Sequence, residues 1–124
     1  MEKKSLKILV MDDEEIVRDV LGQMLGYLGH QIWVCLNEKE AVAKYLKAAF
    51  DSKPFDLVIL DLIIPGHRNG SEILKDLKKI NQNVIAIVSS GYSDKTPEGF
   101  SVFLPKPYRR EDLKKALEEA LEKK

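Results

Sequence analysis

Short apolar runs rich in β-branched residues alternate along this chain with segments whose apolar residues recur at helical spacing. The runs occupy residues 6–11, 31–35, 56–60, 84–89 and 101–104. Several are apolar nearly throughout, which is typical of parallel strands covered on both faces. Because a crossover helix returns the chain to start each next parallel strand, this alternation predicts an α/β fold with a doubly wound parallel sheet.

The intervening segments predict helices with recognisable ends. The first carries apolar residues from Ile16 to Leu28 and ends at Gly29. Asn37 and Ser71 have side chains that can cap the second and third helices. The last helix runs through residues 113–121. No repeat or linker divides the sequence, so we expect one domain over residues 1–124.

Charge and cysteine content exclude several functions. Lys and Arg total 20, as do Asp and Glu, so no basic excess favours a nucleic acid or an anionic membrane as partner. No apolar stretch is long enough to cross a bilayer, and no signal-peptide core follows Met1. The single Cys35 lies in an apolar run and is interpreted as a small buried hydrophobe. We expect a cytoplasmic protein.

Polar residues gather where the predicted strands end, which is where doubly wound sheets bind ligands. They are Asp12, Asp13, Asp61, Ser89, Ser90 and Lys106. Three neighbouring carboxylates repel one another and need a cation, and carboxylate oxygens suit Mg²⁺. The attraction between a carboxylate and a lysine ammonium 4 Å away is about 4 kcal/mol at an effective dielectric of 20, before the cost of desolvation. A single strand-end Asp or Ser often only caps a turn, but polar residues at four strand ends together favour a site for a phosphoryl group.

Four segments in this order resemble the receiver domains of bacterial response regulators in two-component systems. They are Ile8–Glu15, Phe55–Gly66, Val88–Gly91 and Phe103–Pro107. The resemblance spans essentially the whole chain and implies the flavodoxin-like (βα)5 fold with strand order 2-1-3-4-5. The loop after Asp61 and the residues Ser-Gly-Tyr-Ser after the fourth strand are most similar to receivers attached to hybrid histidine kinases.

The resemblance also implies a chemical role for each strand-end residue. Asp61 accepts a phosphoryl group from a histidine kinase, a phosphotransfer protein or a small phosphodonor. Mg²⁺ is held directly by Asp13, Asp61 and the backbone oxygen of Ile63, and through water by Asp12. Lys106 pairs with the phosphoryl oxygens. Such a domain assists its own phosphorylation and dephosphorylation and is otherwise not an enzyme.

A conformational switch is implied in the same way. Ser90 is the switch hydroxyl, which would gain a charge-assisted hydrogen bond to the new phosphoryl group. Phe103 is the ring that turns inward when Ser90 moves. Gly91 leaves space beside the site, and the Lys106-Pro107 peptide is expected to be cis.

The segment between Ser90 and Lys106 is shorter than in the family. The missing residues fall where a fourth helix belongs, and the remaining segment is polar and interrupted by Pro97, which disfavours a helix. We therefore expect this helix to be shortened or absent. Because it forms much of the family's dimerisation face, we also expect a monomer.

Other functions fit the sequence less well. A small Mg²⁺-dependent phosphatase of the haloacid-dehalogenase type would need a second Asp two residues after its nucleophile, where Glu14 follows Asp12. A flavin-binding module would need a Ser-, Thr- and Gly-rich loop after the first strand. A receiver-like scaffold without phosphorylation would not need the full acidic set. A receiver segment of a hybrid histidine kinase remains an alternative to a stand-alone receiver.

Overall fold

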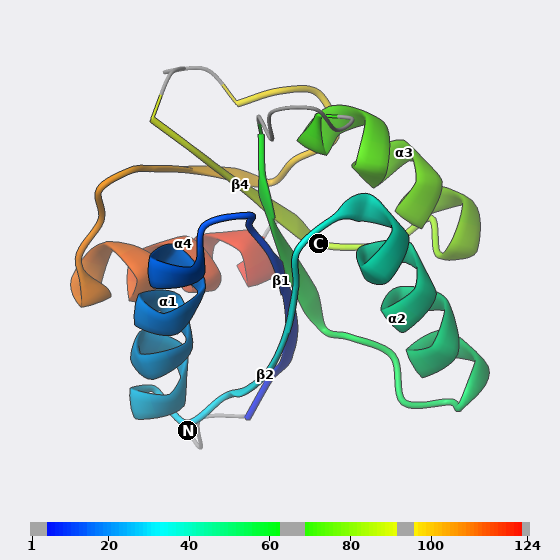
Figure 1. Cartoon of the computed structure of the whole chain (residues 1–124), viewed down its shortest axis with the longest axis horizontal. Coiled ribbons are helices and arrows are strands. Elements are labelled where there is room, and N and C mark those ends of the chain that lie inside the picture. Colours follow the sequence, from blue (N-terminus) through cyan, green and yellow to red (C-terminus); the bar gives the residue numbers. More distant parts are fainter. Residues whose placement is uncertain (1–4, 63–68, 92–95, 123–124) are drawn as a thin grey trace.

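The computed structural model describes residues 5–62, 69–91 and 96–122. In these residues the chain forms five strands and four helices (Figure 1). The strands are β1 (Lys7–Met11), β2 (Gln31–Cys35), β3 (Leu57–Asp61), β4 (Ala86–Ser90) and β5 (Val102–Pro105). The helices are α1 (Glu15–Tyr27), α2 (Glu38–Phe50), α3 (Gly70–Ile80) and α4 (Arg110–Glu122). All strands are parallel in the order β2-β1-β3-β4-β5, so the predicted fold and strand order are confirmed.

Helices cover both faces of the sheet, with α1 and α4 on one side and α2 and α3 on the other (Figure 1). Each face has its own buried cluster. Leu57, Ile59 and Ile87 belong to the cluster with α1 and α4 residues, whereas Val58 and Val88 belong to the cluster with α2 and α3 residues. Alternate residues of a strand thus point to opposite layers, which explains why the strands are apolar nearly throughout.

Local capping follows the sequence at one helix and departs from it at another. The Asn37 side chain accepts a hydrogen bond from the backbone N–H of Glu40, as predicted. Ser71, in contrast, does not cap α3, so that prediction was wrong. Asn69 is the cap, and its side chain and that of Glu72 each accept a hydrogen bond from the other's backbone N–H. This reciprocal capping box satisfies two free N–H groups and leaves Ser71 inside the first turn.

The segment between β4 and β5 contains no helix in its described residues, 91 and 96–100. This agrees with the predicted shortened or absent helix, although residues 92–95 lie outside the described residues. Phe100 is buried in the cluster that includes Leu74 and Leu77 of α3. Gly99 has a φ of +93°, a conformation that a side chain would strain. The described end of this segment is therefore a short turn that places the Phe100 ring in the core beside α3.

Cys35 is buried at the end of β2, and its thiol lies 3.4 Å from the backbone oxygen of Val10. Burial raises the pKa of the Cys35 thiol to about 12. The thiolate, which is the reactive form, is therefore suppressed at neutral pH, in keeping with a packing role. Among the described residues, no helix is long and apolar enough to cross a bilayer.

Candidate functional site

Three aspartates meet at the carboxyl edge of the sheet. Asp61 is the last residue of β3, while Asp12 and Asp13 directly follow β1, the neighbouring strand. One carboxylate oxygen from each lies within 4.8 Å of those of the other two. Asp12 and Asp61 are buried and Asp13 is exposed. The strand-end residues that the sequence singled out are thus brought together here.

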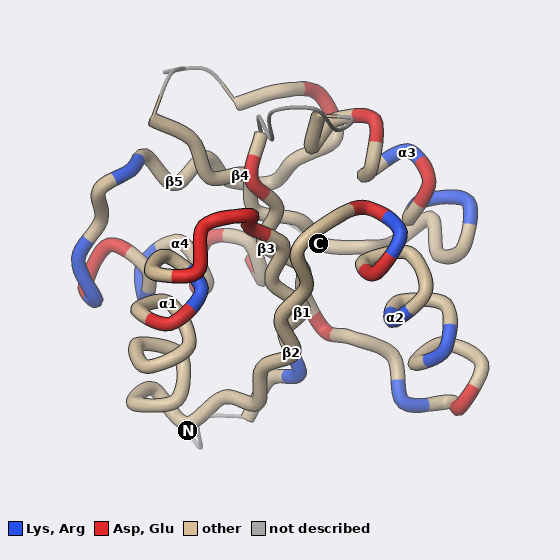
Figure 2. Tube along the Cα trace, viewed as in Figure 1, with Lys and Arg blue, Asp and Glu red and all other residues tan. Residues whose placement is uncertain are grey.

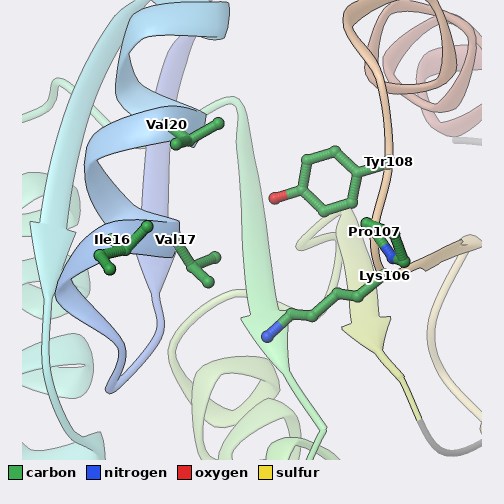
Figure 3. A pocket seen from close by; sticks show the side chains of 6 residues that line it. All are labelled: Ile16, Val17, Val20, Lys106, Pro107 and Tyr108. Atoms are coloured by element: carbon green, nitrogen blue, oxygen red, sulfur yellow. The ribbon is translucent and has the colours of Figure 1, made fainter.

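Lys106 supplies the positive charge at this acidic cluster. It follows β5, and its side chain extends toward the end of β3 (Figure 3). Its ammonium lies 2.9 Å from Oδ2 of Asp12 and 3.4 Å from Oδ2 of Asp61. Burial by itself would lower the pKa of Lys106, but the hydrogen bond with Asp12 and the charges of Asp12 and Asp61 outweigh it and raise the pKa. The ammonium is therefore held charged.

The oxygens of Asp12, in the side chain and in the backbone, accept hydrogen bonds. Its Oδ2 accepts the Lys106 hydrogen bond, and its Oδ1 accepts one from the backbone N–H of Glu14 at 2.9 Å. Its backbone oxygen accepts a hydrogen bond from Nη1 of Arg18 at 2.8 Å. Asp13, the next residue in the same turn, is exposed to solvent. Figure 2 shows the run of acidic residues from the end of β1 into α1. Of this pair, Asp13 has the side chain that is accessible to an incoming ion.

Gly70 fixes the backbone of the central aspartate, which the sequence did not predict. A Cβ added at Gly70 would lie 2.7 Å from the backbone oxygen of Asp61 and 3.2 Å from Cα of Leu62. The Gly70 N–H also donates a 2.8 Å hydrogen bond to the Leu62 oxygen. Because only glycine permits this approach, α3 begins directly against the end of β3.

The remaining expected site residues lie on β4 and β5 or follow them. Ser89 and Ser90 end β4, and both are buried. Phe103 is half-buried and packs against the cluster under α2 and α3. The Lys106–Pro107 peptide bond is cis. Ile63 lies outside the described residues.

The donor set suits a hard divalent cation. Three carboxylate oxygens at close range offer the oxygen ligands that Mg²⁺ takes in proteins, usually through one or two carboxylates with several waters retained. Both oxygens of Asp12 already accept hydrogen bonds, whereas Asp13 is exposed, so Asp13 is the better placed of these two to serve as a direct ligand. The residues present therefore fit Mg²⁺.

An apolar groove of about 370 Å³ adjoins the site. Figure 3 shows Lys106 and Tyr108 facing α1 across it. Its lining residues are Ile16, Val17, Val20, Lys106, Pro107 and Tyr108. Burial, and after it the charges of Asp12 and Asp61, raise the pKa of Tyr108. Sequence reasoning missed Tyr108, although its place after Lys106 and Pro107 puts it at the same sheet edge.

Comparison with known proteins identifies the family to which this chain is similar. The model of the response regulator receiver domain matches residues 8–118. Sporulation initiation phosphotransferase F of Bacillus subtilis is 35% identical over 88 residues, which cover 71% of this chain and 66% of that protein. The sensory transduction protein LytT of the same organism is 30% identical over 116 residues, 90% of this chain but 46% of that protein. The chain therefore spans less than two thirds of the length of these relatives.

Two solved structures are also similar to this chain. The receiver domain from hybrid histidine kinase CckA has a TM-score of 0.79 and 29% identity, with 93% of this chain and 98% of that chain covered. A chain in the crystal structure of histidine kinase ThkA in complex with response regulator protein TrrA has a TM-score of 0.77 and 29% identity, covering 94% of this chain and 98% of that one.

Proposed function

The chain belongs to the response regulator receiver domain family of two-component signalling, and we propose that it accepts a phosphoryl group on Asp61 in a Mg²⁺-dependent reaction. One observation carries the proposal: Lys106 contacts Asp12 and Asp61 at the edge of the sheet, beside an accessible third carboxylate. Incubation with acetyl phosphate and Mg²⁺, followed by intact-mass measurement, should give a gain of one acid-labile phosphoryl group. Absence of that gain would contradict the proposal.

The transfer needs little from the protein beyond position and charge. A carboxylate oxygen of Asp61 forms a bond to phosphorus while the bond from phosphorus to the donor breaks. With a phosphohistidine donor, the electron pair returns to the imidazole nitrogen, which takes a proton from solvent. Lys106 is placed to neutralise charge on the transferred oxygens, so no general base is required.

Asp13, Asp61 and the backbone oxygen of Ile63 would hold Mg²⁺, with Asp12 acting through water. The bound ion supplies charge neutralisation that lets an anionic carboxylate approach an anionic phosphoryl group. Lys106 already compensates part of the acidic cluster without metal. Because part of the negative charge is already compensated, we expect Mg²⁺ to bind weakly.

Replacing Asp13 by Ala should lower the affinity for Mg²⁺ at least about tenfold, since it removes the accessible carboxylate ligand. Isothermal titration calorimetry would measure this. The stabilisation that Mg²⁺ gives to wild-type protein by mass action should shrink in parallel. Glu15→Ala, a neighbouring acidic residue outside the cluster, is the matched control. Unchanged Mg²⁺ affinity in the Asp13 variant would refute its assignment as a ligand.

We propose that phosphorylation is transmitted by Ser90 and Phe103. Ser90 ends the strand next to β3, and Phe103 lies on the following strand, β5. A hydrogen bond from the Ser90 hydroxyl to a phosphoryl dianion is of a strength, roughly 1.5–3 kcal/mol, that shifts a balanced two-state equilibrium about tenfold to a hundredfold. Phe103, which is half-buried, has room to change its degree of burial.

We propose that a histidine kinase or phosphotransfer protein docks on the groove beside α1. Ile16 is 78% exposed and Val20 is 43% exposed, and both line the apolar groove next to Lys106. A partner seated there would bring its phosphohistidine to the edge of the sheet that carries Asp61. The chain that is similar to this one in the ThkA–TrrA complex is consistent with partners of this class.

Ile16→Glu should slow phosphorylation by a phosphorylated phosphotransfer domain at least about tenfold, because a charge would be desolvated at the interface. Its rate with acetyl phosphate should change far less, since the side chain is exposed and is not a member of the acidic cluster. Both rates would be followed by gel autoradiography. Phe50→Glu, an exposed substitution on α2, is the control. Equal slowing with both donors would place the effect in the site rather than in docking.

We propose that residues 1–124 act as one receiver unit and as a monomer. The described residues 96–100 form no helix. The helix that forms much of the family's dimerisation face is therefore not present in these residues. Both a stand-alone receiver and the receiver segment of a hybrid histidine kinase agree with the similarity to the CckA domain.

A further inference from the structure

The Ser89 hydroxyl is buried without a hydrogen-bond partner. Ser89 is 3% exposed, and within the described part of the chain its Oγ is the buried side-chain oxygen that has no partner. Buried polar atoms are nearly always paired, because leaving one unpaired destabilises the fold. Such an exception at a site calls for a reason.

Ser89 lies on the same layer of the sheet as Asp61 and directly beside it. Ile87 and Ile59 belong to the cluster under α1 and α4, and side chains alternate along each strand. Ser89 and Asp61, each two residues further on, therefore face that same layer. They are register partners on adjacent parallel strands, which are spaced about 4.8 Å apart.

The neighbours of Ser89 in this layer, along the strand and across the ladder, other than Asp61, are apolar. Leu104, its register partner on β5, is apolar, as is Ile87 on its own strand. Ser90 lies on the opposite layer and has an interaction of its own. The Ser89 hydroxyl is therefore distinct from the expected switch hydroxyl, and the Asp61 carboxylate is its polar neighbour across the ladder.

We propose that Ser89 is a positioning residue whose hydroxyl donates a hydrogen bond to the Asp61 side chain when Asp61 carries the phosphoryl group. The inference rests on the proposed function of Asp61. In the structure, Oδ2 of Asp61 accepts a 3.4 Å hydrogen bond from the Lys106 ammonium, which also donates one to Asp12. When the phosphoryl group engages Lys106, Asp61 gives up its hydrogen bond with that ammonium, and a carboxyl oxygen of Asp61 can accept one from the Ser89 hydroxyl instead. A hydrogen bond that Ser89 makes only after phosphorylation thus favours the phosphorylated state.

Ser89→Ala should therefore weaken the binding of beryllofluoride with Mg²⁺, a stand-in for the phosphoryl group, about tenfold. The same variant in the empty state should unfold in urea at an equal or higher denaturant midpoint than wild type, because it removes a buried unpaired oxygen. A role in structure alone would not raise stability while lowering affinity. ¹⁹F NMR titration and equilibrium unfolding would measure the two effects.

A pair of variants with matched shape separates the hydroxyl from packing. Ser89→Thr keeps the hydroxyl and should bind beryllofluoride within about threefold of wild type, whereas Ser89→Val has the same shape without it and should match Ser89→Ala. Ile87→Val, on the same face of β4, is the packing control, with lower stability and unchanged affinity. Unchanged affinity in both Ser89→Ala and Ser89→Val would overturn this inference alone. Wild-type protein that binds no beryllofluoride would overturn the proposed function and the inference with it.

Discussion

An Asp61→Asn protein should take up no phosphoryl group from acetyl phosphate, while wild type gains one. The amide cannot form the acyl phosphate, because it lacks the anionic oxygen that attacks phosphorus. The fold should remain intact, since Asn has nearly the same shape and Lys106 keeps its 2.9 Å contact with Asp12. Removing one of three clustered negative charges should leave the metal-free protein as stable as wild type or more so. Intact-mass measurement and urea unfolding would test the two parts.

The exposed Asp51 provides the matched control for this substitution. It lies at the end of α2 and pairs with Lys47 on the surface, so Asp51→Asn should be phosphorylated as wild type is. Acid-labile phosphate retained in the Asp61 variant would move the nucleophile elsewhere, with Asp13 the next candidate.

Lys106→Met should destabilise the metal-free protein by about 3 kcal/mol, because removing one partner of a buried ion pair leaves an uncompensated buried charge. Methionine keeps the unbranched apolar stem but leaves the buried carboxylates of Asp12 and Asp61 without their cation. Urea unfolding would measure the loss. Mg²⁺ should restore part of the stability, because it supplies positive charge to the same cluster. Phosphorylation by acetyl phosphate should slow markedly.

The pH dependence of this loss has a definite sign. Pairing raises the pKa of Lys106 in the folded protein above its ordinary value of 10.5. The stabilisation is therefore fully present below the ordinary value and is lost as the pH rises through the raised folded value. The difference between wild type and Lys106→Met should be constant through neutral pH and shrink only in strong alkali. Lys47→Met, which removes the exposed pair with Asp51, should change stability by about 0.5 kcal/mol or less. A loss as small as this at Lys106 would contradict the role given to its charge.

Much of the fold could be predicted because its strands are buried on both faces. Residues 31–35 were predicted without error, and the other strand limits differ by one or two residues. Apolar periodicity also located α1, but it could not tell which apolar residues of the helix are buried. Leu21 and Leu25 are buried, whereas Ile16 is exposed, and hydrophobicity alone does not distinguish these two cases.

The position of the candidate site was also predictable, since the carboxyl ends of parallel strands share one edge. The contacts that hold it in place were not. The Gly70 approach to the Asp61 backbone and the bonds of Arg18 and Glu14 to Asp12 depend on how α3 and α1 start. The unpaired hydroxyl of Ser89 depends on register, which the sequence leaves open between neighbouring strands.

The order in which the strands pair determines how this chain can fold during synthesis. Of the five strands of this sheet, β1 is made first, and it is an interior strand whose two neighbours are β2 and β3. Ile8 pairs on one side with Ile32 and on the other with Leu57, so one edge of β1 stays open until β3 has emerged. Pairings between such distant residues form slowly, because a long loop must close first. A growing chain that ends before residue 57 presents β1 as an uncovered apolar edge, which is prone to mispairing.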